Sequence, residues 1–169
     1  MVDFYKYRIF LSLGSNLGNK QKNIERAYKE IEKRIGTIVS KSAFYCTQPV
    51  GFESENDFVN SVCEVNTSLN AHTVLKETQE IEKEIGRVTK SKNQHYEDRI
   101  IDIDLLLFAD TIIEETNLII PHPRLHLRDF VLTPLAEIAP DVIHPVFNKS
   151  ILQLKRELAG NACRSKSHK

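Results

Sequence analysis

Alternation of hydrophobic and polar residues predicts four main β-strands in this chain. The segments concerned are rich in β-branched and aromatic side chains and lie between clusters of Gly, Pro, Asn and Asp, as strands separated by turns do. They cover residues 7–13, 37–46, 58–66 and 99–108. The last segment is almost entirely apolar, which predicts a buried strand at the centre of the sheet. Residues 112–113 are expected to pair with this strand as a short hairpin.

A spacing of three or four residues between apolar positions predicts helices in the segments between the strands. These helices are expected at residues 20–35, 71–86, 130–139 and 151–159. Asn19 and Asn70 precede the first two, and their side chains are suited to cap the free N–H groups of a helix N-terminus. Pro134 is expected to interrupt the third helix and Gly160 to end the fourth.

The order strand–helix–strand–strand–helix–strand predicts an α+β fold with a ferredoxin-like split βαβ core. Its sheet is antiparallel, with helices packed on one face. The connections at residues 47–57 and 87–98 are longer than a hairpin requires and are expected to form long active-site loops at one end of the sheet. A single domain is expected over residues 8–160, followed by a polar, basic tail at 161–169 that is expected to be disordered.

Composition narrows the functional classes. The chain has 169 residues, with 23 Lys plus Arg against 23 Asp plus Glu, so no overall field attracts a polyanion and a nucleic-acid partner is disfavoured. No apolar run reaches the length of a signal peptide core or a membrane span. The 3 cysteines have no metal-binding spacing, which favours reduced thiols in a cytoplasmic protein. Nothing in the sequence indicates an obligate protein partner.

Two aspartates in the most apolar segment are the main chemical signal. Asp102 and Asp104 are two positions apart, so on a strand they leave the same face with Cα atoms roughly 7 Å apart. Carboxylates placed so close need a cation, and a hard ion with oxygen ligands such as Mg²⁺ fits. The alternative is that they end an edge strand and face water. Leu106 and Phe108 are expected to continue the same face, which favours a covered site, and both interpretations stay open on this pattern alone.

A glycine-containing turn follows the first strand. Gly14 and Gly18, with Ser and Asn between them, expose backbone N–H groups before a helix, where an anion can bind. The spacing matches neither G-x-G-x-x-G nor a P-loop with its lysine. A plain strand-to-helix connection is therefore the favoured interpretation.

Basic residues gather near the aspartates in sequence. Residues 121–128 hold two histidines and two arginines, and arginine binds phosphate through paired hydrogen bonds. Together with Arg87, Arg99 and Arg128, the aspartates and the two long loops suggest a nucleoside triphosphate site. Phosphoryl-type transfer there would use two Mg²⁺ ions about 4 Å apart.

Two other classes remain possible on these residues. A ferredoxin-like module that binds a small ligand or RNA without catalysis would have no use for the aspartate pair. A Mg²⁺-dependent nucleotidyltransferase or phosphohydrolase also uses paired carboxylates. The products formed from ATP would distinguish these classes.

The order and spacing of several motifs resemble the 6-hydroxymethyl-7,8-dihydropterin pyrophosphokinase family of folate biosynthesis. The motifs are LSLGSNLGN at 11–19, SAFYCTQPVG at 42–51, DFVN at 57–60, TQEIEKEIGR at 78–87, RIIDIDLLLF at 99–108 and PHPRLHLRDFVLTPLAEIAP at 121–140. The resemblance implies transfer of the terminal pyrophosphate of ATP to the hydroxymethyl oxygen of the pterin, with release of AMP. The attack would occur at the β-phosphorus.

The resemblance also implies a role for individual residues. It implies that Asp102 and Asp104 bind two Mg²⁺ ions. It also implies that the ATP phosphates are bound by Arg87, Arg99, His122 and Arg128, and that the nucleotide is contacted by Gln79 and Glu82. The pterin ring would lie between Phe58 and Phe130 and be recognised by Asn60 and the backbone around Thr47, Pro49 and Val50. The substrates are thus two small molecules, ATP and the hydroxymethyl dihydropterin.

Overall fold

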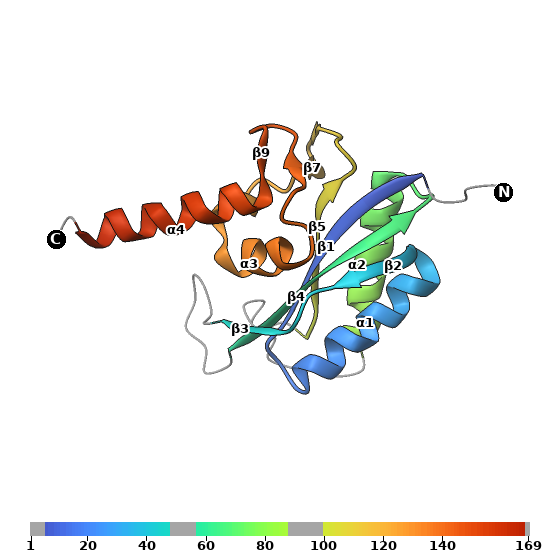
Figure 1. The fold of residues 1–169 in the computed structure, drawn as a ribbon. Helices are drawn as coiled ribbons and strands as arrows, with labels where there is room; N and C mark the ends of the chain where they lie inside the picture. The colour runs from blue at the N-terminus through green and yellow to red at the C-terminus, as the bar shows by residue number, and fades with distance from the viewer. Residues whose placement is uncertain (1–5, 48–56, 88–99, 168–169) are drawn as a thin grey trace.

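The fold is an antiparallel sheet covered by helices on both faces, as a computed structural model shows (Figure 1). The structure describes residues 6–47, 57–87 and 100–167, without the side chains of Arg87 and 162–167. The main sheet contains β1 (Tyr7–Ser15), β2 (Gly36–Lys41), β3 (Tyr45–Thr47), β4 (Phe58–Thr67) and β5 (Asp102–Phe108). Its order is β2-β4-β1-β5, and β3 also pairs with β4, so β1 and β4 are the interior strands.

Helices α1 (Lys20–Arg34) and α2 (Ala71–Arg87) cover one face of this sheet. Both predicted N-caps are confirmed, because Asn19 accepts a hydrogen bond from the Lys22 N–H and Asn70 accepts one from the Thr73 N–H. Alternate residues of β1 point toward these helices and are completely buried against their apolar stripes. The predicted ferredoxin-like order is present from β1 to β5, with two short strands, β2 and β3, in place of the single strand predicted at 37–46.

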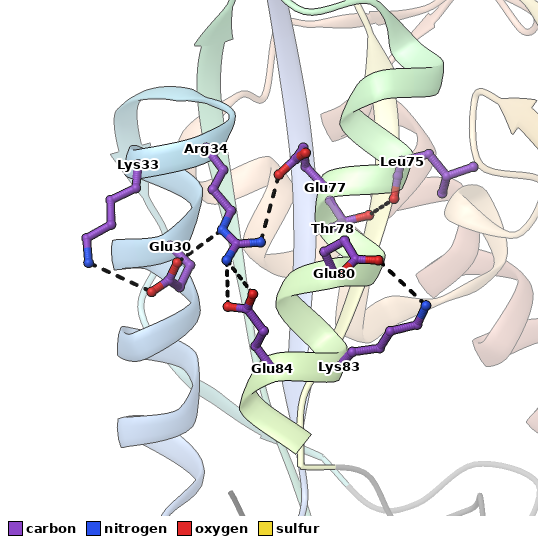
Figure 2. Close-up of polar contacts among 9 residues, drawn as sticks. All are labelled: Glu30, Lys33, Arg34, Leu75, Glu77, Thr78, Glu80, Lys83 and Glu84. Atoms are coloured by element: carbon purple, nitrogen blue, oxygen red, sulfur yellow. Dashed lines mark hydrogen bonds and ion pairs between the residues drawn. The ribbon is translucent and has the colours of Figure 1, made fainter. Parts of the chain in front are cut away.

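A charged cluster joins α1 to α2 on the outer surface (Figure 2). The guanidinium of Arg34 lies 2.6 Å from both carboxylate oxygens of Glu84 and 3.2 Å from Glu30, which is one turn earlier on its own helix. Glu77 lies 3.9 Å away on α2. A planar guanidinium satisfies several carboxylates at once, so Arg34 fixes the spacing of the two helices.

The two helices of the ferredoxin-like core cover one face as predicted, and helices that follow this core in the chain cover the second face. Helices α3 (Asp129–Ile138) and α4 (Ile151–Ser167) pack there with the short helix η1 (Leu125–Leu127). Phe10, Val62 and Leu106 supply the sheet side of this second core. Because both faces of β1 and β4 are covered, nearly every residue along these two strands is buried, and the burial does not alternate.

The predicted strand at 37–46 divides into β2 and β3, both paired with β4. Ser42 lies between them and exchanges hydrogen bonds with Val62, donating its N–H to the carbonyl and accepting the Val62 N–H at its hydroxyl. The Ser42 hydroxyl thus takes the place of a backbone carbonyl as the acceptor of the Val62 N–H, and the regular pairing of β2 with β4 ends here.

Strand β5 is at the edge of the main sheet, not at its centre as predicted. Its pairing with β1 skips Leu106, since Phe10 lies opposite Leu107 and Leu11 opposite Leu105. This bulge places Leu106 and Leu107 in the second core and returns Phe108 to the first. The expectation that Phe108 shares the face of Leu106 was therefore wrong.

Two small hairpins follow β5. Strands β6 (Ile113–Glu115) and β7 (Leu118–Ile120) pair with each other, so residues 112–113 do not pair with β5 as predicted. Strands β8 (Ile143–His144) and β9 (Lys149–Ser150) form the second hairpin before α4.

Helices α3 and α4 both continue through the residues predicted to stop them. Pro134 lies inside α3, and α4 passes Gly160 to reach Ser167, extending away from the sheet in Figure 1. Glycine costs a helix only about 1 kcal/mol, which does not end it by itself. The predicted disordered tail is thus helical over 161–167, and residues 168–169 lie outside the described part. The predicted single domain at 8–160 stays a prediction.

Within the described ranges, no helix is both long and apolar enough to cross a membrane. Cys63 is buried and Cys46 is exposed, and neither forms a disulfide.

Candidate active site

The candidate site lies at one end of the main sheet, on the face covered by α3. The register of the three neighbouring strands places Gly14 of β1 opposite Asn60 of β4 and opposite Asp102 of β5. One step further into the sheet, Ser12 lies opposite Val62 and Asp104. Residues opposite each other in antiparallel strands point to the same face. The sheet thus brings an amide and two carboxylates to one surface, separated by the width of a single strand.

Asp102 and Asp104 leave β5 on the same side, as the sequence predicted, and both are half-buried. Glu82 of α2 joins them from the free edge of β5, where its Oε2 accepts the Ile103 N–H at 3.0 Å. Burial raises the pKa of Glu82 to about 8, and the charges of Asp102 and Asp104 also raise it. This concentration of acidic groups fits a bound cation, which would lower the repulsion among them.

The protein ligands for such a cation are few. Among the described residues, no group of three or more His, Cys, Asp and Glu side chains has a metal-holding arrangement. Mg²⁺ in nucleotide-dependent enzymes is commonly held by one or two carboxylates, with phosphate and water oxygens completing its octahedron. The aspartate pair fits that pattern of ligands.

His122 lies beside the same strand, because its N–H donates to the Leu106 carbonyl at 2.9 Å. Its Nδ1 accepts the Arg124 N–H at 3.1 Å, so a neutral ring carries its proton on Nε2. The pKa of His122 is lowered to about 4, chiefly by burial and also by the charges of Arg128 and Arg124, while the charge of Asp102 acts in the opposite direction. At neutral pH His122 is therefore an uncharged N–H donor.

Arg128 and Phe130 lie at the beginning of α3. The guanidinium carbon of Arg128 is 5.5 Å from the centre of the Phe130 ring, within the range of a cation–π contact. Glu137, two turns later, accepts the Ala43 N–H at 3.1 and 3.2 Å and the Tyr45 hydroxyl proton. These bonds attach α3 to the chain around β3 and so fix where Phe130 stands above the sheet.

The predicted pterin side of the site is built on β3 and β4. Asn60 is 4% exposed, and its Nδ2 donates to the Thr47 hydroxyl at 2.7 Å. Thr47 lies opposite Phe58 in the strand pairing. Pro49 and Val50, predicted to take part through their backbone, lie outside the described residues.

The remaining predicted residues differ in what the structure says of them. Gln79 is exposed on α2. Glu82 was predicted to contact the nucleotide, and in the structure its carboxylate accepts the Ile103 N–H. Arg87 is the last residue of α2, with its side chain outside the description, and Arg99 lies outside the described residues.

Sequence reasoning missed Gly14, which it placed in a turn. The structure places Gly14 inside β1, between Asn60 and Asp102. A glycine within a strand often marks a place where a ligand or another backbone approaches closely, and this signal was available in the sequence.

A sequence profile of 7,8-dihydro-6-hydroxymethylpterin-pyrophosphokinase (HPPK) matches residues 10–140. The chain belongs to the HPPK family. It is 41% identical over 138 residues to the 2-amino-4-hydroxy-6-hydroxymethyldihydropteridine pyrophosphokinase of Porphyromonas gingivalis, covering 81% of this chain and 93% of the relative. The protein of the same name from Aquifex aeolicus is 38% identical over 149 residues, covering 88% and 91%. Membership makes the chain a pyrophosphokinase and confirms the family predicted from the motifs.

HPPK sequences also occur within longer chains. The folic acid synthesis protein FOL1 of Dictyostelium discoideum is 39% identical over 150 residues, which are 89% of this chain but 22% of that protein. A crystal structure of Plasmodium falciparum HPPK-DHPS superposes with a TM-score of 0.75 at 20% identity, and the match covers 96% of this chain and 45% of the solved one. The structural match confirms the α+β fold.

Proposed function

We propose that this chain transfers the terminal diphosphate of ATP to the hydroxymethyl group of 6-hydroxymethyl-7,8-dihydropterin and releases AMP. Family membership supports the reaction class. The observation that carries the proposal within the structure is the alignment of Asn60 and Asp102 on either side of Gly14. The amide of Asn60 can recognise a heterocycle and the carboxylate of Asp102 can bind a metal ion. Their backbones lie about 10 Å apart on one surface, because two strand spacings separate them.

The bond changes define what the site must stabilise. The pterin hydroxyl oxygen attacks the β-phosphorus, and the bond from that phosphorus to the oxygen bridging it to the α-phosphate breaks. The bridging oxygen leaves with AMP, and the hydroxyl proton is lost to solvent. Two Mg²⁺ ions held by Asp102 and Asp104 would neutralise charge on the phosphate oxygens and align the two reacting groups.

Residues around the aspartates would hold the phosphates. His122 offers an uncharged Nε2–H donor, which can bind a phosphate oxygen without adding a second cation beside Arg128. Arg128 brings a fixed positive charge from the N-cap position of α3. Arg87 and Arg99, which flank the segment 88–98, are proposed to bind the phosphates as the family resemblance implies, with Gln79 on the nucleotide side.

Aromatic and amide groups would hold the pterin. Phe58 projects from β4, and Phe130 stands at the beginning of α3, which Glu137 attaches to the β3 segment. A flat heterocycle between two rings gains stacking as well as burial. Asn60, already held by Thr47, would recognise the polar edge of the pterin without the entropic cost of ordering a free side chain.

Incubation with ATP, Mg²⁺ and the hydroxymethyl dihydropterin tests the proposal, with products separated by chromatography. Formation of AMP and the pterin diphosphate only when both substrates are present is the expected result. ADP, or AMP and diphosphate formed without pterin, would indicate a phosphohydrolase or nucleotidyltransferase instead. Binding without turnover would indicate a binding module.

A further inference from the structure

We infer that Gly14 is a specificity-determining residue, because any side chain at this position would occupy the floor of the proposed pterin subsite. The inference rests on the proposed function and adds to it a residue on the interior strand β1. Gly14 lies within β1 and directly opposite both Asn60 and Asp102, so any side chain there would project between them.

Side chains on this face of β1 become smaller toward the site. Phe10 fills the second core, Ser12 follows beside Asp104, and Gly14 comes last beside Asp102. On β5 the neighbouring residues change from apolar Leu106 to the aspartates in the same direction, and on β4 the amide Asn60 lies opposite Gly14. The side chains of β1 are therefore smallest where the polar groups converge.

The space above Gly14 is limited on the pterin side. A Cβ atom added there would lie 3.0 Å from Asn60 Oδ1 and 3.7 Å from the Phe58 ring. The first distance is shorter than the roughly 3.5 Å of an ordinary non-bonded contact. Asn60 cannot move aside freely, because its Nδ2 is hydrogen-bonded to Thr47 at 2.7 Å. One methyl group would thus cover this part of the sheet surface and press against the amide that is proposed to recognise the pterin.

Backbone conformation does not explain this glycine. Among the described glycines, only Gly18 has a positive φ, so alanine fits the backbone of Gly14. Alanine also loses less conformational entropy than glycine on folding. The substitution Gly14→Ala should therefore preserve the fold while it weakens one substrate.

The test measures the affinities of Gly14→Ala for both substrates by calorimetry, using a non-hydrolysable ATP analogue with Mg²⁺ and then the hydroxymethyl dihydropterin. We expect the Kd of the pterin, and its KM in turnover, to rise on the order of tenfold or more, with the Kd of the ATP analogue within about twofold of wild type. The ratio of the two affinities is the readout, because a general loss of folding would weaken both.

Gly160→Ala is the matched control, since nothing lies within 4 Å of a Cβ added there. It should leave both affinities unchanged. Unchanged pterin affinity in Gly14→Ala, or equal losses for the two substrates, would overturn the inference. Failure of the wild-type protein to form AMP with the pterin would overturn the proposed function instead, so the two failures are distinguishable.

Discussion

Glu82 of α2 accepts the backbone N–H of Ile103 at 3.0 Å, between the two aspartates of β5. Strand β5 is at the edge of the main sheet, so this N–H has no strand partner on that side. The carboxylate satisfies it and attaches α2 to the segment from which Asp102 and Asp104 project. Glu82 thus helps to hold the backbone that positions the two proposed metal ligands.

Loss of this contact should affect metal use more than folding. Glu82→Ala leaves the Ile103 N–H without its acceptor, which costs about 1–2 kcal/mol of stability and loosens the aspartate pair. We expect a higher Mg²⁺ concentration for half-maximal activity and a lower kcat. Glu82→Gln keeps an acceptor oxygen and should restore much of the loss. If both variants responded to Mg²⁺ as the wild type does, Glu82 would have no positioning role.

Removal of either aspartate should abolish turnover while preserving the fold. Asp102→Ala and Asp104→Ala each delete a proposed metal ligand, and each also removes one of the two neighbouring charges that raise the pKa of Glu82. AMP formation should fall below detection, with a melting temperature equal to or above that of wild type by circular dichroism. Near-normal turnover in either variant would contradict the metal assignment.

Phe130 should distinguish the two substrates. Its ring lies at the beginning of α3, partly buried against the second core and within a cation–π distance of Arg128. Phe130→Ala removes one side of the proposed stack, so pterin binding should weaken far more than ATP binding, by about 1–3 kcal/mol. Calorimetry with each substrate measures this difference. Equal losses would count against stacking, and Phe130→Tyr, which keeps a ring, serves as the control.

Stability should decline in mild acid because the pKa values of His122 and His144 are both lowered, and the contribution of His144 can be separated by mutation. This residue is 3% exposed, and its Nδ1 accepts the N–H groups of Val146 and Phe147. Burial lowers the pKa of His144 from 6.5 to about 4, and the charge of His126 acts in the same direction. Between these values the unfolded chain binds a proton that the folded chain excludes, so stability is complete above about pH 6.5 and falls as the pH approaches 4.

Denaturant titrations between pH 7 and 4 measure this decline, which should reach on the order of 2 kcal/mol. His144→Asn retains an acceptor oxygen but cannot take up a proton. Its stability should change less over the same range, and an identical pH dependence in both proteins would exclude His144 as the cause.

Patterns within single segments determined much of this protein. The caps Asn19 and Asn70, the helical stripes and the shared face of Asp102 and Asp104 depend only on residues near one another in sequence, and the structure confirms them. Such features follow from the helical and strand periods, which are fixed by backbone geometry. The family was also evident from the spacing of its motifs.

Tertiary structure decided how these segments meet. The bulge at Leu106, the division of one predicted strand at Ser42 and the cover of the second face by α3 and α4 depend on contacts between distant residues. Strand periodicity gives which residues share a face but not which strands are neighbours or where they are aligned. Gly14 lies between Asn60 and Asp102 because of the register of three paired strands, and the Ile103 N–H reaches Glu82 because α2 packs beside β5. No single segment of the sequence encodes either relationship.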